Sequence, residues 1–226
     1  MTEFMLDSAN LEAIALWADA FPLAGVTGNP SILKKEGRID FFPHLRKIRG
    51  IIGADRSLHV QVVAADAPFI VREAETILRN IDEGVFIKIP CTREGIKAMK
   101  ILKQRGIRVT ATAVYTQLQG FMAAALGADY IALYYNRMTA MDIDADRSIG
   151  ALRKTLDREA APSRILAASF RVAAQVTDAI QAGAHSVTVT DSILGDALGL
   201  GIIQAAAEDF RKDWVAMQGD VSIADV

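Results

Sequence analysis

Short runs of β-branched and aromatic residues alternate with longer stretches of helical periodicity along the whole chain. Eight of these runs have the length and composition of strands, and a helical pattern follows each one. The predicted strands are Phe4–Leu6, Leu23–Val26, Leu58–Ala64, the run around Val85–Ile89, Ile107–Val114, Tyr130–Tyr134, Arg164–Ala168 and Ser186–Val189. This alternation predicts a parallel sheet whose crossover connections are right-handed.

Eight strand–helix units in 226 residues favour an α/β fold of the closed (β/α)8 TIM-barrel type. We expect one domain over residues 1–226, with a C-terminal helical tail at 214–226 after a last helix from about Asp191 towards Lys212. An open, doubly wound sheet is the alternative, but it would normally carry a glycine-rich nucleotide fingerprint after its first strand. Residues 7–10 of this chain have no glycine. The polar stretch 136–146 is interpreted as a loop at the mouth of the barrel.

A lysine interrupts the fourth apolar run. Lys88 stands within Val85–Pro90, a segment otherwise typical of a strand buried on both faces. Burying an ammonium costs several kcal/mol unless it is paired, solvated or discharged by a lowered pKa. From these residues alone, Lys88 is either a charge tolerated at a strand end or a catalytic amine. Strand alternation predicts that Lys88 and Phe86 point inwards, towards the barrel axis.

Polar side chains occur where the other strands end. The carboxyl ends of the strands form the active-site face of a TIM barrel, so these side chains are expected to converge around Lys88. They are Asp7, Thr27, Asn29, Gln61, Thr112, Tyr134 and Ser169. Alternation along the seventh strand predicts that Ser169 shares the inner face with Ala167. Each also has an ordinary structural interpretation: Asp7 as a helix cap, Thr27 and Asn29 as parts of a turn, and the others as internal hydrogen-bonding groups.

Charge and cysteine content exclude several classes of function. The chain has 25 basic and 27 acidic residues without a long run of either sign, so neither nucleic acid nor a membrane is an expected partner. The three histidines, His59 among them, lack metal-ligand spacing, and we expect no metal and no cofactor. The single cysteine, Cys91, and a start that does not resemble a signal peptide predict a cytoplasmic location.

A neutral lysine in a largely apolar pocket is a good nucleophile towards a ketone or an aldehyde, with which it forms a Schiff base. Ser169 and Arg171 follow the seventh strand, where a hydroxyl, backbone N–H groups and a guanidinium suit a phosphate. Arg137, three residues after Tyr134, offers a second guanidinium. A sugar phosphate that carries a carbonyl group would use both features.

Seven segments resemble the transaldolase family, in particular its short, fructose 6-phosphate aldolase-like branch. These segments are Leu6–Asp7, Gly25–Ser31, Gln61–Val62, Ile87–Pro90, Thr112–Tyr115, Tyr134–Arg137 and Ala167–Arg171. The resemblance implies a (β/α)8 barrel in which Lys88 forms the Schiff base. It also implies a homo-oligomer, which in this branch of the family is a ring-shaped decamer. It also implies that Asp7 positions the amine and reactant hydroxyls.

The same resemblance implies roles for the remaining polar residues. Thr27 and Asn29 would hold the dihydroxyacetone unit, and Arg137, Ser169 and Arg171 would bind the phosphate. Gln61, Thr112 and Tyr134 would position the water or hydroxyl that moves protons.

Transaldolases proper tend to have Glu and Phe where this chain has Gln61 and Tyr134. The prediction is therefore a class I aldolase that releases free dihydroxyacetone. A transaldolase that passes the three-carbon unit between sugar phosphates is the first alternative, and a non-catalytic sugar-phosphate-binding barrel is the second. Gly28 and Leu133 depart from the family pattern and leave the preferred donor and acceptor open.

Overall fold

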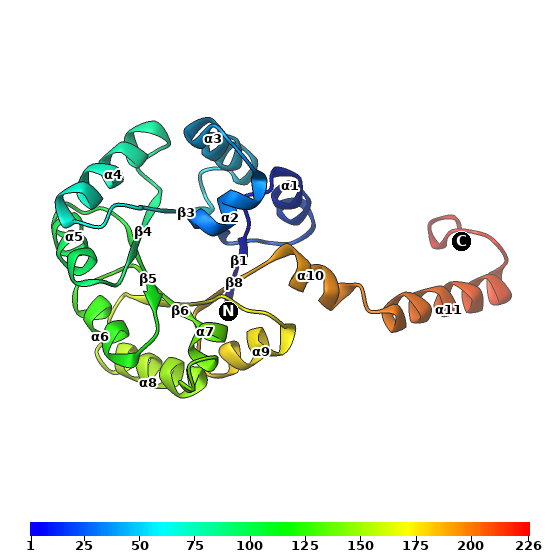
Figure 1. The fold of residues 1–226 in the computed structure, drawn as a ribbon. Helices are drawn as coiled ribbons and strands as arrows, with labels where there is room; N and C mark the ends of the chain where they lie inside the picture. Colours follow the sequence, from blue (N-terminus) through cyan, green and yellow to red (C-terminus); the bar gives the residue numbers. More distant parts are fainter. The chain divides into compact units, whose positions relative to one another are not determined.

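The computed structural model describes residues 1–226, the whole sequence. Eight parallel strands form a closed barrel in which each strand pairs with the next in sequence and β8 pairs with β1 (Figure 1). The predicted (β/α)8 TIM barrel is confirmed. The strands are β1 (Glu3–Asp7), β2 (Gly25–Thr27), β3 (Ser57–Gln61), β4 (Phe86–Pro90), β5 (Val109–Val114), β6 (Tyr130–Tyr134), β7 (Arg164–Ala168) and β8 (Ser186–Val189).

Helices surround the ring of strands in Figure 1. They are α1 (Leu11–Ala20), α2 (Pro30–Leu33), α3 (Phe41–Ile52), α4 (Ala67–Asn80), α5 (Arg93–Gln104), α6 (Gln117–Ala125), α7 (Tyr135–Thr139), α8 (Ala145–Arg158) and α9 (Ala173–Gln181). The chain continues with α10 (Asp191–Leu198) and α11 (Gly201–Gln218), and two short 3-10 segments are η1 (Lys34–Glu36) and η2 (Ile223–Asp225).

Both faces of the strands are buried. Met5, Tyr130, Ala132 and Leu166 pack together inside the barrel, and Phe86 packs against them. The neighbours of Lys88 along β4, Ile87 and Ile89, are fully buried, and alternation directs them towards the helices. Phe86 and Lys88 share the inner face, as the sequence predicted.

Pairing between neighbouring strands brings inner-face residues to the same level. Gln61 of β3 pairs with Lys88 of β4, and Lys88 pairs with Thr110 of β5. Met5 of β1 pairs with Thr188 of β8, and Asp7 pairs with Thr27 of β2. The closed barrel thus gathers polar side chains from widely separated parts of the sequence around Lys88.

The start of α5 fixes the end of the lysine strand. The Thr92 hydroxyl accepts a hydrogen bond from the Gly95 backbone N–H at 3.0 Å and caps this helix. A Cβ at Gly95 would lie 2.0 Å from the carbonyl oxygen of Pro90, so only glycine lets the helix approach the strand this closely.

Two predicted elements are corrected. The stretch 136–146 is not simply a loop, because α7 occupies Tyr135–Thr139 and α8 begins at Ala145. A single turn of helix is too short for its periodicity to be recognised in the sequence. The last helix is not continuous from Asp191 to Lys212 either, since α10 ends at Leu198 and α11 begins at Gly201. Glycines at 195, 199 and 201 lower helix propensity at this break.

The chain forms two compact units, Met1–Asp191 and Ser192–Val226. The first contains the complete barrel. In the second, α11 has no buried residue and presents Ile202, Phe210 and Met217 to solvent.

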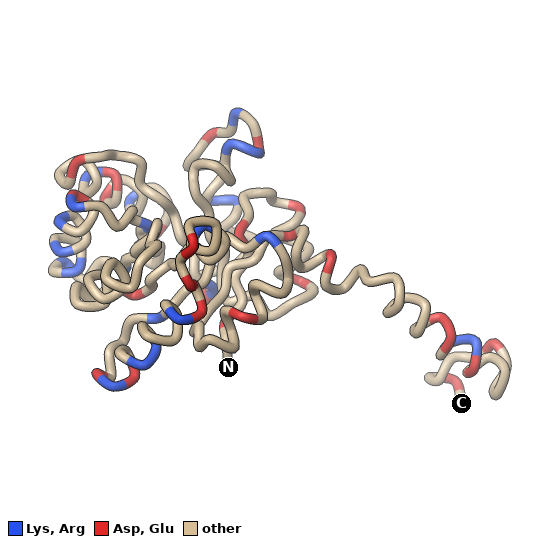
Figure 2. Tube along the Cα trace, turned by 60° about the horizontal axis from the view of Figure 1, so that its bottom comes forward, with Lys and Arg blue, Asp and Glu red and all other residues tan.

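Basic and acidic residues are interspersed along the chain without a long run of either sign. Figure 2 shows Lys and Arg interspersed with Asp and Glu along the helices. None of the helices has both the length and the apolar composition that crossing a membrane would need.

Candidate active site

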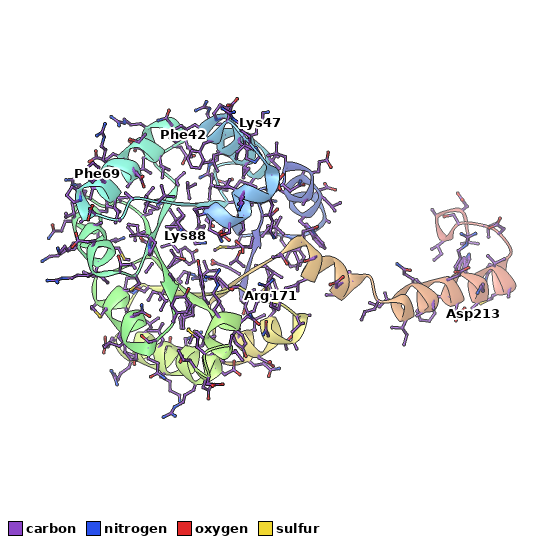
Figure 3. The ribbon with its side chains drawn as sticks, in the orientation of Figure 1. Phe42, Lys47, Phe69, Lys88, Arg171 and Asp213 are labelled. Carbon is purple, nitrogen blue, oxygen red and sulfur yellow. The ribbon has the colours of Figure 1, made fainter.

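Lys88 lies inside the ring of strands, as Figure 3 shows, and only 2% of its surface is exposed. Its Nζ donates a hydrogen bond to the carbonyl oxygen of Gly28 at 3.1 Å. Burial lowers the pKa of the Lys88 ammonium below its ordinary value, and the negative charge of Asp7 opposes that shift. The side chain is therefore held in place while its proton is more easily lost than that of a surface lysine.

Asp7 of β1 is hydrogen-bonded to a hydroxyl group on β2, which is bonded in turn to a hydroxyl group on β8. The Thr27 hydroxyl donates to the Asp7 carboxylate at 2.6 Å, and the Thr27 and Thr188 hydroxyl oxygens lie 2.7 Å apart. Because the proton of Thr27 is used towards Asp7, the hydroxyl of Thr188 is the donor to Thr27. Burial raises the pKa of Asp7, while Lys88 and then the Thr27 hydrogen bond oppose the rise.

Asp7 is not the cap of the first helix. Asn10 is the N-cap of α1, and its side-chain oxygen accepts from the Ala13 backbone N–H at 2.9 Å. The Asp7 carboxylate is therefore not used as a helix cap and interacts electrostatically with the Lys88 amine. Thr188 was not recognised in the sequence, because a threonine in a β-branched strand is common and carries no signal of function.

The turn after β2 supplies both the acceptor for Lys88 and an amide. The Asn29 side-chain oxygen accepts from the backbone N–H groups of Ser31 at 2.9 Å and Ile32 at 3.1 Å, so Asn29 is the N-cap of α2. Its side-chain nitrogen makes no hydrogen bond with the protein and remains a donor for a ligand. Asn29 thus has the structural role in the turn that the sequence suggested, and its binding of a ligand stays a prediction.

Gln61 has an unusual environment for an amide. Its Oε1 atom is buried and has no hydrogen-bond partner. Such an acceptor normally binds a protein group or water, and an orphaned one in a native site calls for an explanation. Its place beside Lys88 in the β3–β4 register makes a water or a substrate hydroxyl the natural donor.

Thr112 and Tyr134 form a pair on β5 and β6. Their hydroxyl oxygens lie 3.0 Å apart, and Tyr134 is 8% exposed. Burial raises the pKa of Tyr134, so the phenol carries its proton at neutral pH. Ala113, next to Thr112, has a φ of 54°, and the pairing of β5 with β6 shifts its register between Ala111 and Val114. This irregularity sets the direction of the chain that follows Thr112.

Arg137 extends from α7 over the Tyr134 ring. The centre of its guanidinium lies 5.1 Å from the ring centroid, and its Nη1 donates to the Tyr115 hydroxyl at 3.3 Å. Arg137 is exposed and forms no ion pair, so its charge is available to an anion.

Ser169 and Arg171 lie in the segment that joins β7 to α9. Strand alternation suggested that Ser169 shares the inner face with Ala167, and that prediction is wrong. Leu166 is the inward residue, and Ala167 pairs with the outward Leu133. Ser169 follows the strand with a φ of 65°, so alternation does not determine its direction. Arg171 is exposed and precedes the first residue of α9, Ala173.

Two residues that the sequence did not single out join this segment to α7. The Gln175 side-chain oxygen accepts from the Arg171 backbone N–H at 2.8 Å, and its nitrogen donates to the side-chain oxygen of Asn136 at 3.0 Å. The Asn136 backbone N–H donates to the Ser169 carbonyl at 3.3 Å. These bonds hold the elements that carry Arg137 and Arg171 next to each other.

Below the lysine, the barrel core contains a hydrogen-bonded histidine. His59 stacks on Phe86 with 4.8 Å between ring centroids, and its nitrogens lie 2.8 Å from the Thr110 hydroxyl and 3.0 Å from that of Ser57. Burial, and then the charges of Lys88 and Arg49, lower the pKa of His59 to about 3. As expected, it is a satisfied core residue. No group of three His, Cys, Asp or Glu side chains is arranged to hold a metal ion.

The fold and the site define a (β/α)8 barrel with a buried lysine at the carboxyl ends of its strands. A family model, Transaldolase/Fructose-6-phosphate aldolase, matches residues 4–220. The chain is 46% identical over 221 residues to a "Probable fructose-6-phosphate aldolase" from Streptococcus pneumoniae (strain ATCC 700669 / Spain 23F-1), which covers 98% of this chain and 100% of the relative. The chain belongs to the transaldolase/fructose-6-phosphate aldolase family.

A solved structure described as "Native KDPGal structure" resembles the chain in fold. The TM-score is 0.60 at 12% identity, and the match covers 84% of this chain and 82% of the other. At this identity the similarity supports the barrel fold and nothing about the reaction.

Proposed function

We propose that this protein is a class I aldolase that reversibly cleaves fructose 6-phosphate to dihydroxyacetone and glyceraldehyde 3-phosphate, with Lys88 as the Schiff-base nucleophile. The observation that carries the proposal is the environment of Lys88. Its side chain is 2% exposed, its pKa is lowered, and the Asp7 carboxylate that interacts with it accepts a hydrogen bond from Thr27, which is bonded in turn to Thr188. The name of the relative from Streptococcus pneumoniae supports the same reaction.

The reaction begins when the neutral Lys88 amine attacks the C2 ketone of the sugar. Addition followed by loss of water gives an imine, whose protonated form withdraws electrons from C3. Asp7 balances the positive charge of this imine and orients the adjacent hydroxyls. The lowered pKa of Lys88 favours the first step, because only the neutral amine has the lone pair that attacks.

Cleavage needs one base and one acid. Loss of the proton on the C4 hydroxyl breaks the C3–C4 bond, which releases glyceraldehyde 3-phosphate and leaves an enamine on Lys88. A proton delivered to C3 converts the enamine to the imine of dihydroxyacetone, and water then hydrolyses this imine. We assign both proton transfers to Tyr134, supported by Thr112, with a water held by Gln61. The phenol gives its proton to C3, and the proton of the C4 hydroxyl passes through this water to the phenol oxygen and replaces it.

The phosphate group requires cations beyond the lysine. Arg137 and Arg171 are exposed, and the hydrogen bonds of Gln175 and Asn136 keep their elements together. Ser169 adds a hydroxyl in the same segment. We propose that these three side chains bind the phosphate, and that Asn29 and Thr27 bind hydroxyls of the dihydroxyacetone unit.

The second candidate is transfer of the three-carbon unit to an aldose acceptor, a reaction that the family description also includes. Gln61 and Tyr134 favour release over transfer. An amide orients water but cannot accept its proton, so a phenol becomes the proton carrier.

The test is to supply fructose 6-phosphate with and without erythrose 4-phosphate and to measure free dihydroxyacetone and the seven-carbon ketose phosphate. Release of dihydroxyacetone at a rate independent of erythrose 4-phosphate is the expected result. Product formation only when erythrose 4-phosphate is present would identify a transaldolase. Absence of both products would overturn the proposal.

We also propose a cytoplasmic homo-oligomer. The α11 helix exposes apolar side chains, Phe210 at 73% among them, and the barrel has an apolar hollow of about 640 Å³ beside Gln61. Phe42 and Phe69, labelled in Figure 3, line this hollow. Exposed apolar surfaces of this kind are typical of protein–protein contacts, and association between copies would cover them.

A further inference from the structure

Tyr115 lies at the junction between the phosphate site and the proton-transfer site. Its hydroxyl accepts the Arg137 hydrogen bond at 3.3 Å, and its ring meets the Tyr134 ring edge-on, with centroids 5.6 Å apart and planes at 78°. Arg137 in turn lies over the Tyr134 ring. The three side chains therefore contact one another pairwise.

The backbone of Tyr115 is fixed from both sides. The residue follows Val114, at the point where the register of β5 shifts, and its N–H donates to the Gln119 side-chain oxygen at 3.0 Å. Gln119 belongs to the capping box of α6, together with Thr116. The half-buried Tyr115 ring thus stands on a rigid connection between a strand and a helix, and its hydroxyl has a defined position.

Few interactions fix the side chain of Arg137 apart from those with Tyr115 and Tyr134. It is exposed, forms no ion pair, and makes its side-chain hydrogen bond with the Tyr115 hydroxyl and its cation–π contact with the Tyr134 ring. A long side chain without such contacts would lose considerable rotamer freedom on binding an anion. Pre-organising a ligand-binding group reduces that cost and strengthens binding.

We propose that Tyr115 is a positioning residue that fixes Arg137 over Tyr134, so that binding of the substrate phosphate and proton transfer by Tyr134 depend on one rigid unit. The inference rests on the function proposed above and names a residue that it leaves out. Its consequence is a preference for phosphorylated acceptors. The phosphate binds Arg137 directly, whereas an acceptor without a phosphate depends on the unit only through proton transfer by Tyr134.

The test compares glyceraldehyde 3-phosphate with glyceraldehyde as acceptors for dihydroxyacetone, in the wild type, Tyr115→Phe and Tyr130→Phe. Tyr115→Phe removes the hydroxyl but keeps the ring against Tyr134. We expect the ratio of kcat/KM for the two acceptors to fall about tenfold, mainly through KM for the phosphorylated acceptor, as loss of a hydrogen bond to a charged group predicts. Tyr130→Phe removes a hydroxyl that donates to Glu3, away from the site, and should leave the ratio unchanged.

Binding of inorganic phosphate, measured by calorimetry at constant ionic strength, gives a readout that needs no catalysis. Phosphate binding that is weaker in Tyr115→Phe than in the wild type and Tyr130→Phe supports the inference. If the wild type joins neither acceptor to dihydroxyacetone, the proposed function is wrong, but the comparison of phosphate binding still tests the role of Tyr115. An unchanged acceptor ratio in an active enzyme, or equal phosphate binding in all three proteins, overturns the role of Tyr115.

Discussion

The hydroxyl oxygens of Thr112 and Tyr134 lie 3.0 Å apart on neighbouring strands of the barrel. This contact gives a buried phenol a polar partner, and either hydroxyl can be the donor; when Thr112 donates, the phenol proton is free for another acceptor. The pKa of Tyr134 is raised by its burial, which keeps it protonated at neutral pH and suits it to deliver a proton to carbon.

Replacing Tyr134 by Phe should lower the rate of fructose 6-phosphate cleavage by about 10²–10³-fold, the usual contribution of a positioned acid or base. Imine formation at Lys88 should persist, because the amine and Asp7 are unchanged. Steady-state cleavage and borohydride trapping, measured on the same samples, separate the two steps. Tyr130→Phe on the same strand is the control, and cleavage equal to wild type in Tyr134→Phe would refute the proton-transfer role.

The hydrogen bond from Thr27 to Asp7 should affect the pH dependence of cleavage. Thr27→Val removes a donor that lowers the pKa of the carboxyl, so the pKa of Asp7 should rise. The ionised carboxylate is then lost at higher pH, and the acidic limb of the kcat/KM profile should move upwards. Thr188→Val, which leaves the Thr27–Asp7 bond intact, should move it less. Coincident acidic limbs in Thr27→Val and wild type would contradict the assignment of that limb to Asp7.

His59 makes a prediction about stability. Its pKa is lowered to about 3 in the folded protein, whereas the pKa of an unfolded histidine is near the ordinary value of 6.5. Between these values the unfolded state binds more protons, so stability falls as pH decreases through this window, by at most about 1.4 kcal/mol per pH unit from this residue. Above 6.5 the neutral ring contributes fully.

The check is thermal or urea unfolding of wild type and His59→Phe from pH 4 to 7.5. The phenyl ring keeps a stacking partner for Phe86 but leaves the Thr110 hydroxyl without its partner, so the variant should lose about 1–3 kcal/mol at neutral pH. The gap between the two proteins should narrow as pH falls below 6.5. A gap that is constant with pH would show that His59 does not titrate as described.

The barrel and most of the site were predictable because strand alternation and strand count depend on local sequence. Lys88, Gln61 and Tyr134 all occupy inner-face positions, as the alternation of side chains along each strand predicts. The failures have local physical causes. Ser169 was misplaced because Ala167, taken as its inward neighbour, faces outwards, and because the left-handed backbone of Ser169 ends the alternation there. The glycine-rich break before α11 was hidden by the helical periodicity on either side.

Other residues could not have been found from the sequence alone. Thr188 matters because barrel closure brings β8 to β1, and Gln175 because it bridges two elements that lie some forty positions apart in the sequence. Tyr115 depends on the irregularity in β5. In each case the signal is a contact between elements, and a single sequence contains no information about such contacts when the residue type is ordinary for its position.

Phe210→Asp should weaken self-association. The side chain is 73% exposed on α11, so the change costs the isolated chain little, while an aspartate in an apolar contact between copies would be destabilising. Light scattering coupled to size exclusion measures the mass. Leu118→Asp, a matched change at a 68% exposed leucine of α6, is the comparison. An assembly that survives Phe210→Asp would argue against α11 as the contact.

In the proposed reaction, Lys88 forms the covalent Schiff-base intermediate. The direct measurement is to incubate the protein with dihydroxyacetone, reduce it with borohydride and locate the adduct by peptide mass spectrometry, with Lys88→Met as the control. We expect one adduct per chain, on Lys88, and no adduct on the variant. No adduct, or an adduct that forms equally on Lys88→Met, would contradict it.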